Sequence, residues 1–201
     1  MKKYLLLFFL GLSIVAQAQQ WAVQQIEILP GSSLSITGDT NITDFSCGYD
    51  MGLLDPSYRV NYLESEGVIH FRNTVLKLRN SGFDCGSRGI NKDFHALLQS
   101  DQYPVIDLKL LRVEVQDGQR ARATVAIRIA GLVREYQIPV QLFPEQQKEQ
   151  EQNLQIAGQL QLNISDYDLK PPKKLFGIIV VKDDIQINFN LHLQKAAIAH
   201  R

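Results

Sequence analysis

The sequence has almost no net charge, and this absence excludes a class of partners. Its 21 lysine and arginine residues are balanced by 21 aspartate and glutamate residues. A protein that binds nucleic acid through its phosphates needs a concentrated positive field. The local group of Lys170, Lys173 and Lys174 has aspartates on both sides. We therefore expect no nucleic acid among the partners of this chain.

Long apolar runs are also lacking, apart from one at the start. Residues 4–15 are almost wholly apolar, two lysines precede them, and the small residues of "AQA" follow. This order is typical of a signal peptide, and the run is shorter than the roughly 20 residues of a membrane-spanning helix. The sequence predicts a signal peptide over 1–18 and a single domain over 19–201. We expect export to the periplasm or secretion, with no integral membrane segment in the mature chain.

Cysteine is scarce, since Cys47 and Cys85 are the only two. In an exported protein an even count favours a disulfide over free thiols. A CxxC redox motif is absent, and neither cysteine has the local pattern of a catalytic nucleophile. We predict a disulfide between them, for which the chain-entropy relation gives about 4 kcal/mol as an upper figure.

The sequence shows no recognisable set of metal-binding or catalytic residues. The four histidines are scattered, without partners at the spacing of metal ligands. The "GSRG" at 86–89 lacks the Lys-Ser/Thr ending of a phosphate-binding loop. Asp166 and Asp168 would share one face of a strand, but no partner marks them as a general acid and base. We expect no catalytic residues, no metal and no cofactor.

Alternation of apolar and polar residues is what the sequence has in abundance. A period of two is typical of strands with one buried face. The pattern occurs in 105–115, 120–129, 136–142, 154–164 and 184–194. These segments predict a sheet whose strands bury one side each.

Three segments depart from the alternation. The apolar positions change register between Leu110 and Leu111, which predicts a β-bulge there. Apolar residues recur with helical spacing over 90–98, which predicts a short helix capped by Asn91. The polar segment 144–152 has no period and predicts a long hairpin loop.

Many one-faced strands indicate a closed barrel or a sandwich. Strands of about ten residues, with small inward residues such as Ala121, Ala123 and Gly158, favour a barrel with internal space. We predict an all-β, antiparallel, up-and-down barrel of about eight strands with one short helix. Its apolar interior, the candidate ligand-binding surface, would be formed by Leu108, Leu110, Val125, Ile127, Ile138, Val140, Leu160, Leu162, Phe189 and Leu191.

Four segments resemble, in order, successive motifs of the YceI-like family. They are "SSLSITGDTNITDFSC", "INKDFHALLQSDQYPVIDLKL", "IAGLVREYQIPVQL" and "GQLQLNISDYDLKPPKKLFGIIVVKDDIQINFNL". The cysteine pair and the Pro171-Pro172 turn are similar to the exported branch of that family in Bacteroidetes-type bacteria. The resemblance implies a lipocalin-like barrel that holds a long isoprenoid or other lipid chain, without catalytic residues.

The Pro171-Pro172 turn is predicted to be stiff, because each proline fixes its backbone and removes a donor. Lysines on this turn are either solvated or face the anionic head group of a lipid at the barrel mouth. The short helix would cover an opening. The candidate rim residues are Phe94, Leu97, Lys170, Lys173 and Lys174.

The expected function is therefore to carry or sequester an amphipathic lipid, and not to catalyse a reaction. The alternative is a structural or protein-interaction barrel with a packed core, and the third possibility is an enzyme that acts on a lipid. A cavity of hundreds of Å³ favours the carrier over the structural barrel.

Overall fold

The structure is a computed structural model that describes residues 20–147, 151–170, 173–174 and 179–196. The predicted signal peptide and the Pro171-Pro172 turn lie outside the described residues. The strands are β1 (Ala22–Ile28), β2 (Ser33–Thr40), β3 (Asp44–Tyr49), β4 (Ser57–Ser65), β5 (Val68–Arg79), β6 (Phe83–Asp84), β7 (Val105–Asp117), β8 (Arg120–Ile129), β9 (Leu132–Gln147), β10 (Glu151–Asn163), β11 (Lys173–Lys174) and β12 (Ile179–Ala196). The helices are α1 (Arg88–Leu97) and the 3-10 helices η1 (Met51–Leu53), η2 (Asn80–Gly82) and η3 (Ile164–Tyr167).

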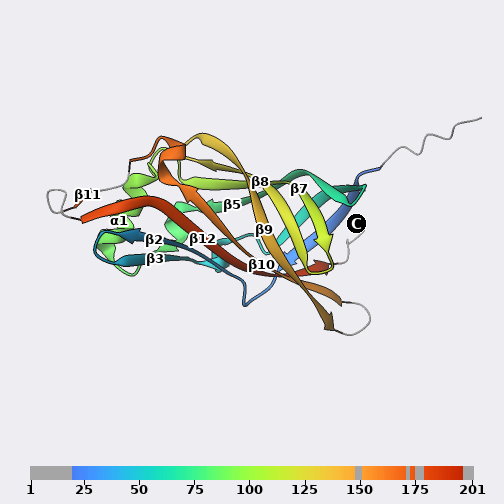
Figure 1. Cartoon of the computed structure of the whole chain (residues 1–201). Coiled ribbons are helices and arrows are strands. Elements are labelled where there is room, and N and C mark those ends of the chain that lie inside the picture. The colour runs from blue at the N-terminus through green and yellow to red at the C-terminus, as the bar shows by residue number, and fades with distance from the viewer. Residues whose placement is uncertain (1–19, 148–150, 171–172, 175–178, 197–201) are drawn as a thin grey trace, which may run out of the picture.

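Eight of these strands close into a ring (Figure 1). Their order is β1, β4, β5, β7, β8, β9, β10 and β12, and β12 returns to β1. Every neighbouring pair in the ring is antiparallel. The ring confirms the predicted all-β antiparallel barrel of about eight strands with one short helix.

The long strand β12 belongs to two parts of the molecule. Its residues Leu193 to Ala196 pair with β1, whereas Ile185 to Asn190 pair with β2. From β2 the sheet continues to β3 and β6. The barrel is therefore elongated (Figure 1). We call the end with α1, β2, β3 and β6 the helix end, and the end to which the β9–β10 hairpin points the hairpin end.

The predicted bulge is present in β7. Leu110 pairs with Val125 and Arg112 pairs with Thr124, so Leu111 has no partner on β8. The apolar residues on either side of the bulge keep their contact with the core because the extra residue restores the inward face.

The predicted long loop over 144–152 is wrong. β9 runs to Gln147 and β10 begins at Glu151, and these two residues pair across the hairpin. β8 accompanies β9 only to Gln141, so the last part of the hairpin has no third strand beside it. A strand that does not face a core needs no alternation of apolar and polar residues. The sequence pattern therefore did not reveal this outer part of the β9–β10 hairpin.

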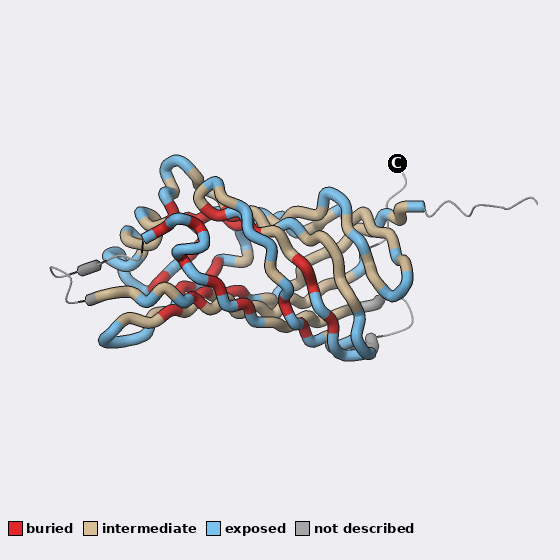
Figure 2. Tube along the Cα trace, turned by 45° about the horizontal axis from the view of Figure 1, so that its top comes forward, coloured by how far each residue is buried: buried red, intermediate tan, exposed pale blue. Residues whose placement is uncertain are grey.

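Buried residues, red in Figure 2, are concentrated from the helix end to the middle of the barrel. The strands β1 and β4, toward the hairpin end, have mostly intermediate exposure. One group of buried inward residues fills the barrel between these regions, and we call it the packed middle: Ala121, Ala123, Ile138, Val140 and Leu160.

Candidate ligand cavity

A cavity of about 350 Å³ lies inside the helix end of the barrel. Almost all of its lining is apolar, and the polar lining residues include Thr40, Thr43, Asp44 and Asp93. Three of these four belong to β2, β3 or the turn between them. An apolar cavity with a few polar groups is the usual form of a small-molecule site.

The ring supplies one wall of the cavity through the inward faces of its strands. Leu108 of β7, Ile127 of β8 and Leu162 of β10 line the cavity, as does Ile187 of β12. Successive side chains of a strand point to opposite faces, so each strand presents every second residue inward. The alternation read from the sequence thus produces this wall.

The sequence candidates for the interior divide into two groups. Leu108, Ile127 and Leu162 line the cavity. The others lie farther along the same face of their strands, toward the hairpin end, and are not among the lining residues: Leu110, Val125, Ile138, Val140, Leu160, Phe189 and Leu191. The structure therefore gathers the first group at one site and leaves the second in the rest of the barrel interior.

The helix α1 forms part of the cavity wall, and its two rim candidates, Phe94 and Leu97, both line the cavity. Phe94 packs on Phe83 of β6, with ring centroids 5.2 Å apart, and Phe83 in turn packs edge-on against Tyr49 at 4.9 Å. Such aromatic pairs add to the free energy of simple burial. The aromatic cluster therefore anchors the inner side of the helix.

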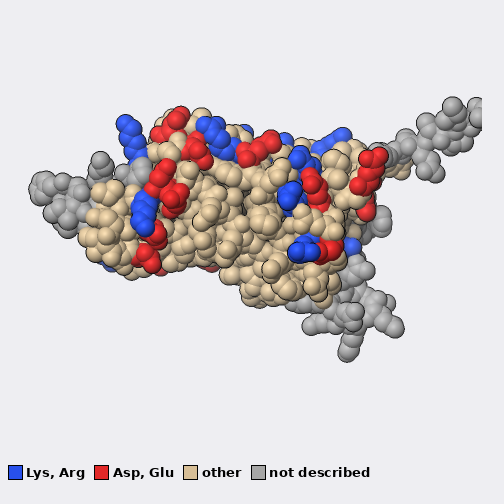
Figure 3. Space-filling view, viewed as in Figure 1, with Lys and Arg blue, Asp and Glu red and all other residues tan. Residues whose placement is uncertain are grey.

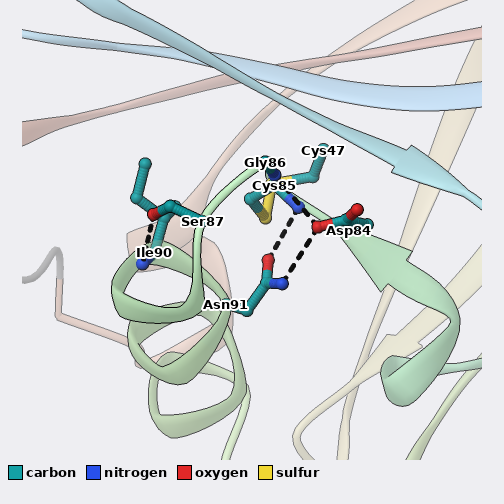
Figure 4. Close-up of a disulfide and its surroundings, with 7 residues drawn as sticks. All are labelled: Cys47, Asp84, Cys85, Gly86, Ser87, Ile90 and Asn91. Atoms are coloured by element: carbon teal, nitrogen blue, oxygen red, sulfur yellow. Dashed lines mark hydrogen bonds between the residues drawn. A yellow bond between two sulfur atoms is a disulfide. The ribbon is translucent and has the colours of Figure 1, made fainter.

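Cys47 and Cys85 form the predicted disulfide, which ties β3 to the segment before the helix (Figure 4).

The predicted cap of α1 was wrong, because the Ser87 hydroxyl accepts the hydrogen bond from the Ile90 amide. Asn91 lies in the first turn of the helix, and its side chain bonds to residues that precede the helix. Its side-chain oxygen accepts from the Cys85 amide at 2.7 Å, and its amide donates to Asp84 at 3.0 Å. The start of the helix is thereby fixed to the disulfide.

A gap in the barrel wall is closed by η3. The pairing of β9 with β10 stops at Val140 and Gly158, so the two strands are not paired beside the cavity. The 3-10 helix contacts both strands, and Ile164, Tyr167 and Leu169 turn buried side chains to the cavity. This segment replaces a stretch of sheet with an apolar patch.

Tyr167 is the most buried residue of that patch, with 2% of its surface exposed. Its hydroxyl donates to the carbonyl oxygen of Ile127 at 3.4 Å. Burial raises the pKa of Tyr167 well above its ordinary value, because the phenolate would lose its water. Burial also raises the pKa of Tyr136 nearby.

The expectation that Asp166 and Asp168 share a strand face is wrong. Asp166 lies in η3, and Asp168 ends that helix with φ of 54°, in the left-handed region. Both carboxylates are exposed. The aspartates therefore belong to the turn that brings Tyr167 and Leu169 inward, and they do not face the cavity.

Comparison with known proteins identifies the family. The YceI-like domain matches residues 65–193, which is more than half of the chain. The chain belongs to the YceI-like family. No curated protein matches it.

Solved structures show the same fold at low sequence identity. Burkholderia cenocepacia BcnA is 16% identical, with a TM-score of 0.57 over 80% of this chain and 95% of that one. A polyisoprenoid binding domain from Saccharophagus degradans is 13% identical, with a TM-score of 0.57 over 86% and 98%. A YceI protein from Campylobacter jejuni is 12% identical, with a TM-score of 0.55 over 63% and 74%.

In this YceI-like chain the structure places the side chain of one of the three lysine candidates. Lys170 is exposed and is not among the residues that line the cavity. The backbones of Lys173 and Lys174 pair with Val180 and Ile179 at the start of β12. Their side chains lie outside the described part of the structure.

Sequence reasoning missed several lining residues of this YceI-like cavity. Leu34 and Ile36 come from β2, Phe45 from β3, and Tyr167 and Leu169 from the η3 segment. The alternation of Leu34 and Ile36 could have revealed β2. No comparable signal marked Tyr167 and Leu169, because they stand among aspartates and prolines in a stretch that reads as a loop.

The outer surface carries both signs of charge. On the face that Figure 3 shows, basic and acidic side chains lie next to each other. Lys182 bonds to Asp39 at 3.1 Å, and Arg128 lies 3.7 Å from Asp107.

Among the residues that the structure describes, no helix has the length and apolar character to cross a membrane. The same residues contain no group of three or more His, Cys, Asp or Glu side chains that could hold a metal ion.

Proposed function

We propose that this protein is exported and binds an amphipathic lipid, with an isoprenoid or fatty-acyl chain, as a carrier or sequestering protein. The observation that carries the proposal is the apolar cavity of about 350 Å³ under α1. Its size falls within the roughly 300–1,000 Å³ of small-molecule sites. The Saccharophagus degradans structure, described as a polyisoprenoid binding domain, supports the same class of ligand. The cysteine pair and the Pro171-Pro172 sequence support membership of the exported Bacteroidetes-type branch.

Burial of the lipid tail supplies the binding energy in this proposal. Each CH₂ group transferred from water gains about 0.8 kcal/mol. A tail of about ten carbons therefore gains about 8 kcal/mol before the cost of immobilisation is subtracted. No covalent step is needed, because the protein acts by shielding the tail from water.

The chemistry of the cavity favours binding over catalysis. Tyr167 lines the cavity, and burial raises the pKa of its hydroxyl. A phenol with a raised pKa is a poorer acid and stays neutral at pH 7. Tyr167 therefore serves as an apolar wall with a satisfied hydroxyl, and we propose no enzymatic role for it.

The structural barrel is the alternative function that an observation favours. The packed middle fills part of the interior with buried side chains, as a barrel without a ligand would require. The two functions differ in whether the helix end ever holds a guest molecule.

Displacement of a fluorescent fatty acid by isoprenoid and acyl lipids distinguishes the two functions. We expect competition with the wild type and a loss of at least several-fold in affinity for Leu108→Phe, which places a larger side chain in the cavity. The matched control is Val115→Phe on the same strand, because Val115 is exposed and does not line the cavity. An absence of specific displacement in the wild type would favour the structural barrel.

The lysines of the rim can be tested with the same assay. If Lys170, Lys173 and Lys174 face an anionic head group, their triple substitution by Gln weakens binding of fatty acids and leaves the matching alcohols unchanged. Equal effects on acids and alcohols would identify the lysines as solvated residues of the turn.

A further inference from the structure

The cavity ends part-way along the barrel, at a layer formed by four strands. On each of these strands the lining residues stop at one level, and the next inward residue toward the hairpin end does not line the cavity. The four residues of this layer, which we call the floor, are Leu110 of β7, Val125 of β8, Leu160 of β10 and Phe189 of β12.

Phe189 is the largest side chain of the floor. It pairs with Gly158 on one side and with Leu34, a lining residue, on the other. Its ring lies over Gly158, because a Cβ added to that glycine would stand 2.5 Å from the ring. The absence of a side chain at Gly158 thus gives the ring its place on the inner surface, directly below the cavity.

Leu160 belongs both to the floor and to the packed middle, and the other packed-middle residues lie beyond the floor on β8 and β9. Ala121, Ile138 and Val140 are each less than 9% exposed. None of the packed-middle residues lines the cavity. A chain that enters from the helix end therefore meets side chains at the level of Phe189, and a longer chain must leave its remaining carbons at the mouth.

The volume of the cavity limits the length of the lipid chain that it can hold. A protein cavity of about 150 Å³ accommodates benzene, which corresponds to about 25 Å³ per carbon atom. At that density the cavity of about 350 Å³ holds about 14 carbons. We propose that this protein selects lipid chains of about 14 or 15 carbons, such as a three-unit isoprenoid or a myristoyl-sized acyl chain, and that Phe189 sets this limit. The inference rests on the proposed function and gives its ligand a size.

The test is the dependence of affinity on chain length. The assay measures how well alcohols displace a fluorescent fatty acid at concentrations below their aggregation limits. The competitors are linear alcohols from about 8 to about 20 carbons and prenyl alcohols of two, three, four and eight units. Affinity is expected to rise about fourfold per added CH₂. The rise stops at about 14 carbons in the linear series and at three units in the prenyl series.

Variants of Phe189 test which side chain sets the limit. Phe189→Ala removes a phenyl group and moves the break in the curve upward by about four to six carbons, because the vacated space is close to that of benzene. Phe189→Leu is the milder variant in case the alanine variant does not fold, and its break moves upward by about two carbons. Phe143→Ala is the matched control, since Phe143 is 41% exposed and does not line the cavity.

The outcomes separate this inference from the proposed function. If affinity rises without a break through about 20 carbons, the size limit is wrong although lipid binding stands. If the break occurs but stays in place in a folded Phe189 variant, Phe189 is not the floor. If no chain binds to the wild type, both the proposed function and the inference fail.

Discussion

The helix end and the packed middle of this barrel are built from the same alternating strands, yet one is hollow and the other is filled. Ile127 and Ile138 illustrate the difference, since they lie on the paired strands β8 and β9 and are 1% and 6% exposed. Ile127 lines the cavity and Ile138 does not. The exposure of a residue therefore does not show whether its neighbours leave a space.

The difference comes from what lies across the barrel. At the helix end the wall includes β2, β3, η3 and α1, whose residues line the cavity together with the ring. In the middle β8 pairs directly with β9, and small residues such as Ala121 and Ala123 are already buried. A wider wall leaves space, and a narrower ring is filled by its own side chains.

The largest expected effect comes from a charge placed on the inner face of the barrel, either at the cavity or at its floor. Ile127→Asp and Phe189→Asp should each lower the free energy of unfolding by several kcal/mol, because both put a carboxylate among apolar side chains. Urea unfolding measures the difference. Asn190→Asp is the control, since Asn190 already accepts a hydrogen bond from Gln155 through its side-chain oxygen. Similar midpoints for all three variants would show that the assignment of inner and outer faces is wrong.

Loss of the disulfide should weaken the helix end alone. The double substitution of Cys47 and Cys85 by Ala removes a cross-link over a sequence separation of 38, which costs about 2–4 kcal/mol. Hydrogen exchange should show faster local opening of β3, β6 and α1, while amides of β8 and β9 exchange only through global unfolding. Reduction of the wild type is the control and should give the same pattern. Uniform loss of protection would contradict a separate role for the helix end.

Truncation of one isoleucine in each region compares the two directly. Ile138→Ala opens a new hole in the packed middle and should cost about 2–5 kcal/mol. Ile127→Ala enlarges a space that already exists, so we expect its cost to be smaller by about 1 kcal/mol. Thermal or urea unfolding of the ligand-free proteins gives both values. Equal costs would mean that the helix end is as tightly packed as the middle.

The smallest expected effect is on stability at high pH. Because burial raises the pKa of Tyr167, the folded state keeps the proton that the unfolded state loses near pH 10. Stability is complete below that pH and should fall above it, by up to about 1.4 kcal/mol per pH unit from this group. Tyr167→Phe should show a weaker decline than the wild type. Parallel pH curves would show that Tyr167 reaches water in the folded state.

The inward faces of the strands could be predicted from the sequence. Which part of the barrel is hollow and which is filled could not. The alternation in β7, β8, β10 and β12 predicted their inward faces, because one-sided burial leaves a period of two in the sequence. The doubled apolar pair Leu110-Leu111 predicted the bulge for the same reason. These features depend on neighbours along one strand.

Features that depend on neighbours across the barrel were beyond the sequence pattern. Whether Leu108 lines a space or touches another side chain is decided by residues far away in the chain, such as those of β2 and α1. The inward turn of Tyr167 depends on the gap between β9 and β10, which no local pattern reveals. The helix cap was misplaced because both Ser87 and Asn91 are good capping residues, and only the contacts with Asp84 and Cys85 separate their roles.

The most direct test of the cavity as a lipid site is native mass spectrometry of the protein purified from the organism that encodes it. The proposal predicts one adduct per chain, which solvent extraction releases as a lipid with a tail of about 14 or 15 carbons. Leu108→Phe, made in the same host, should reduce the adduct, whereas Val115→Phe should retain it. A protein that carries no lipid in its own host, and that binds none when lipids are added, would contradict the account.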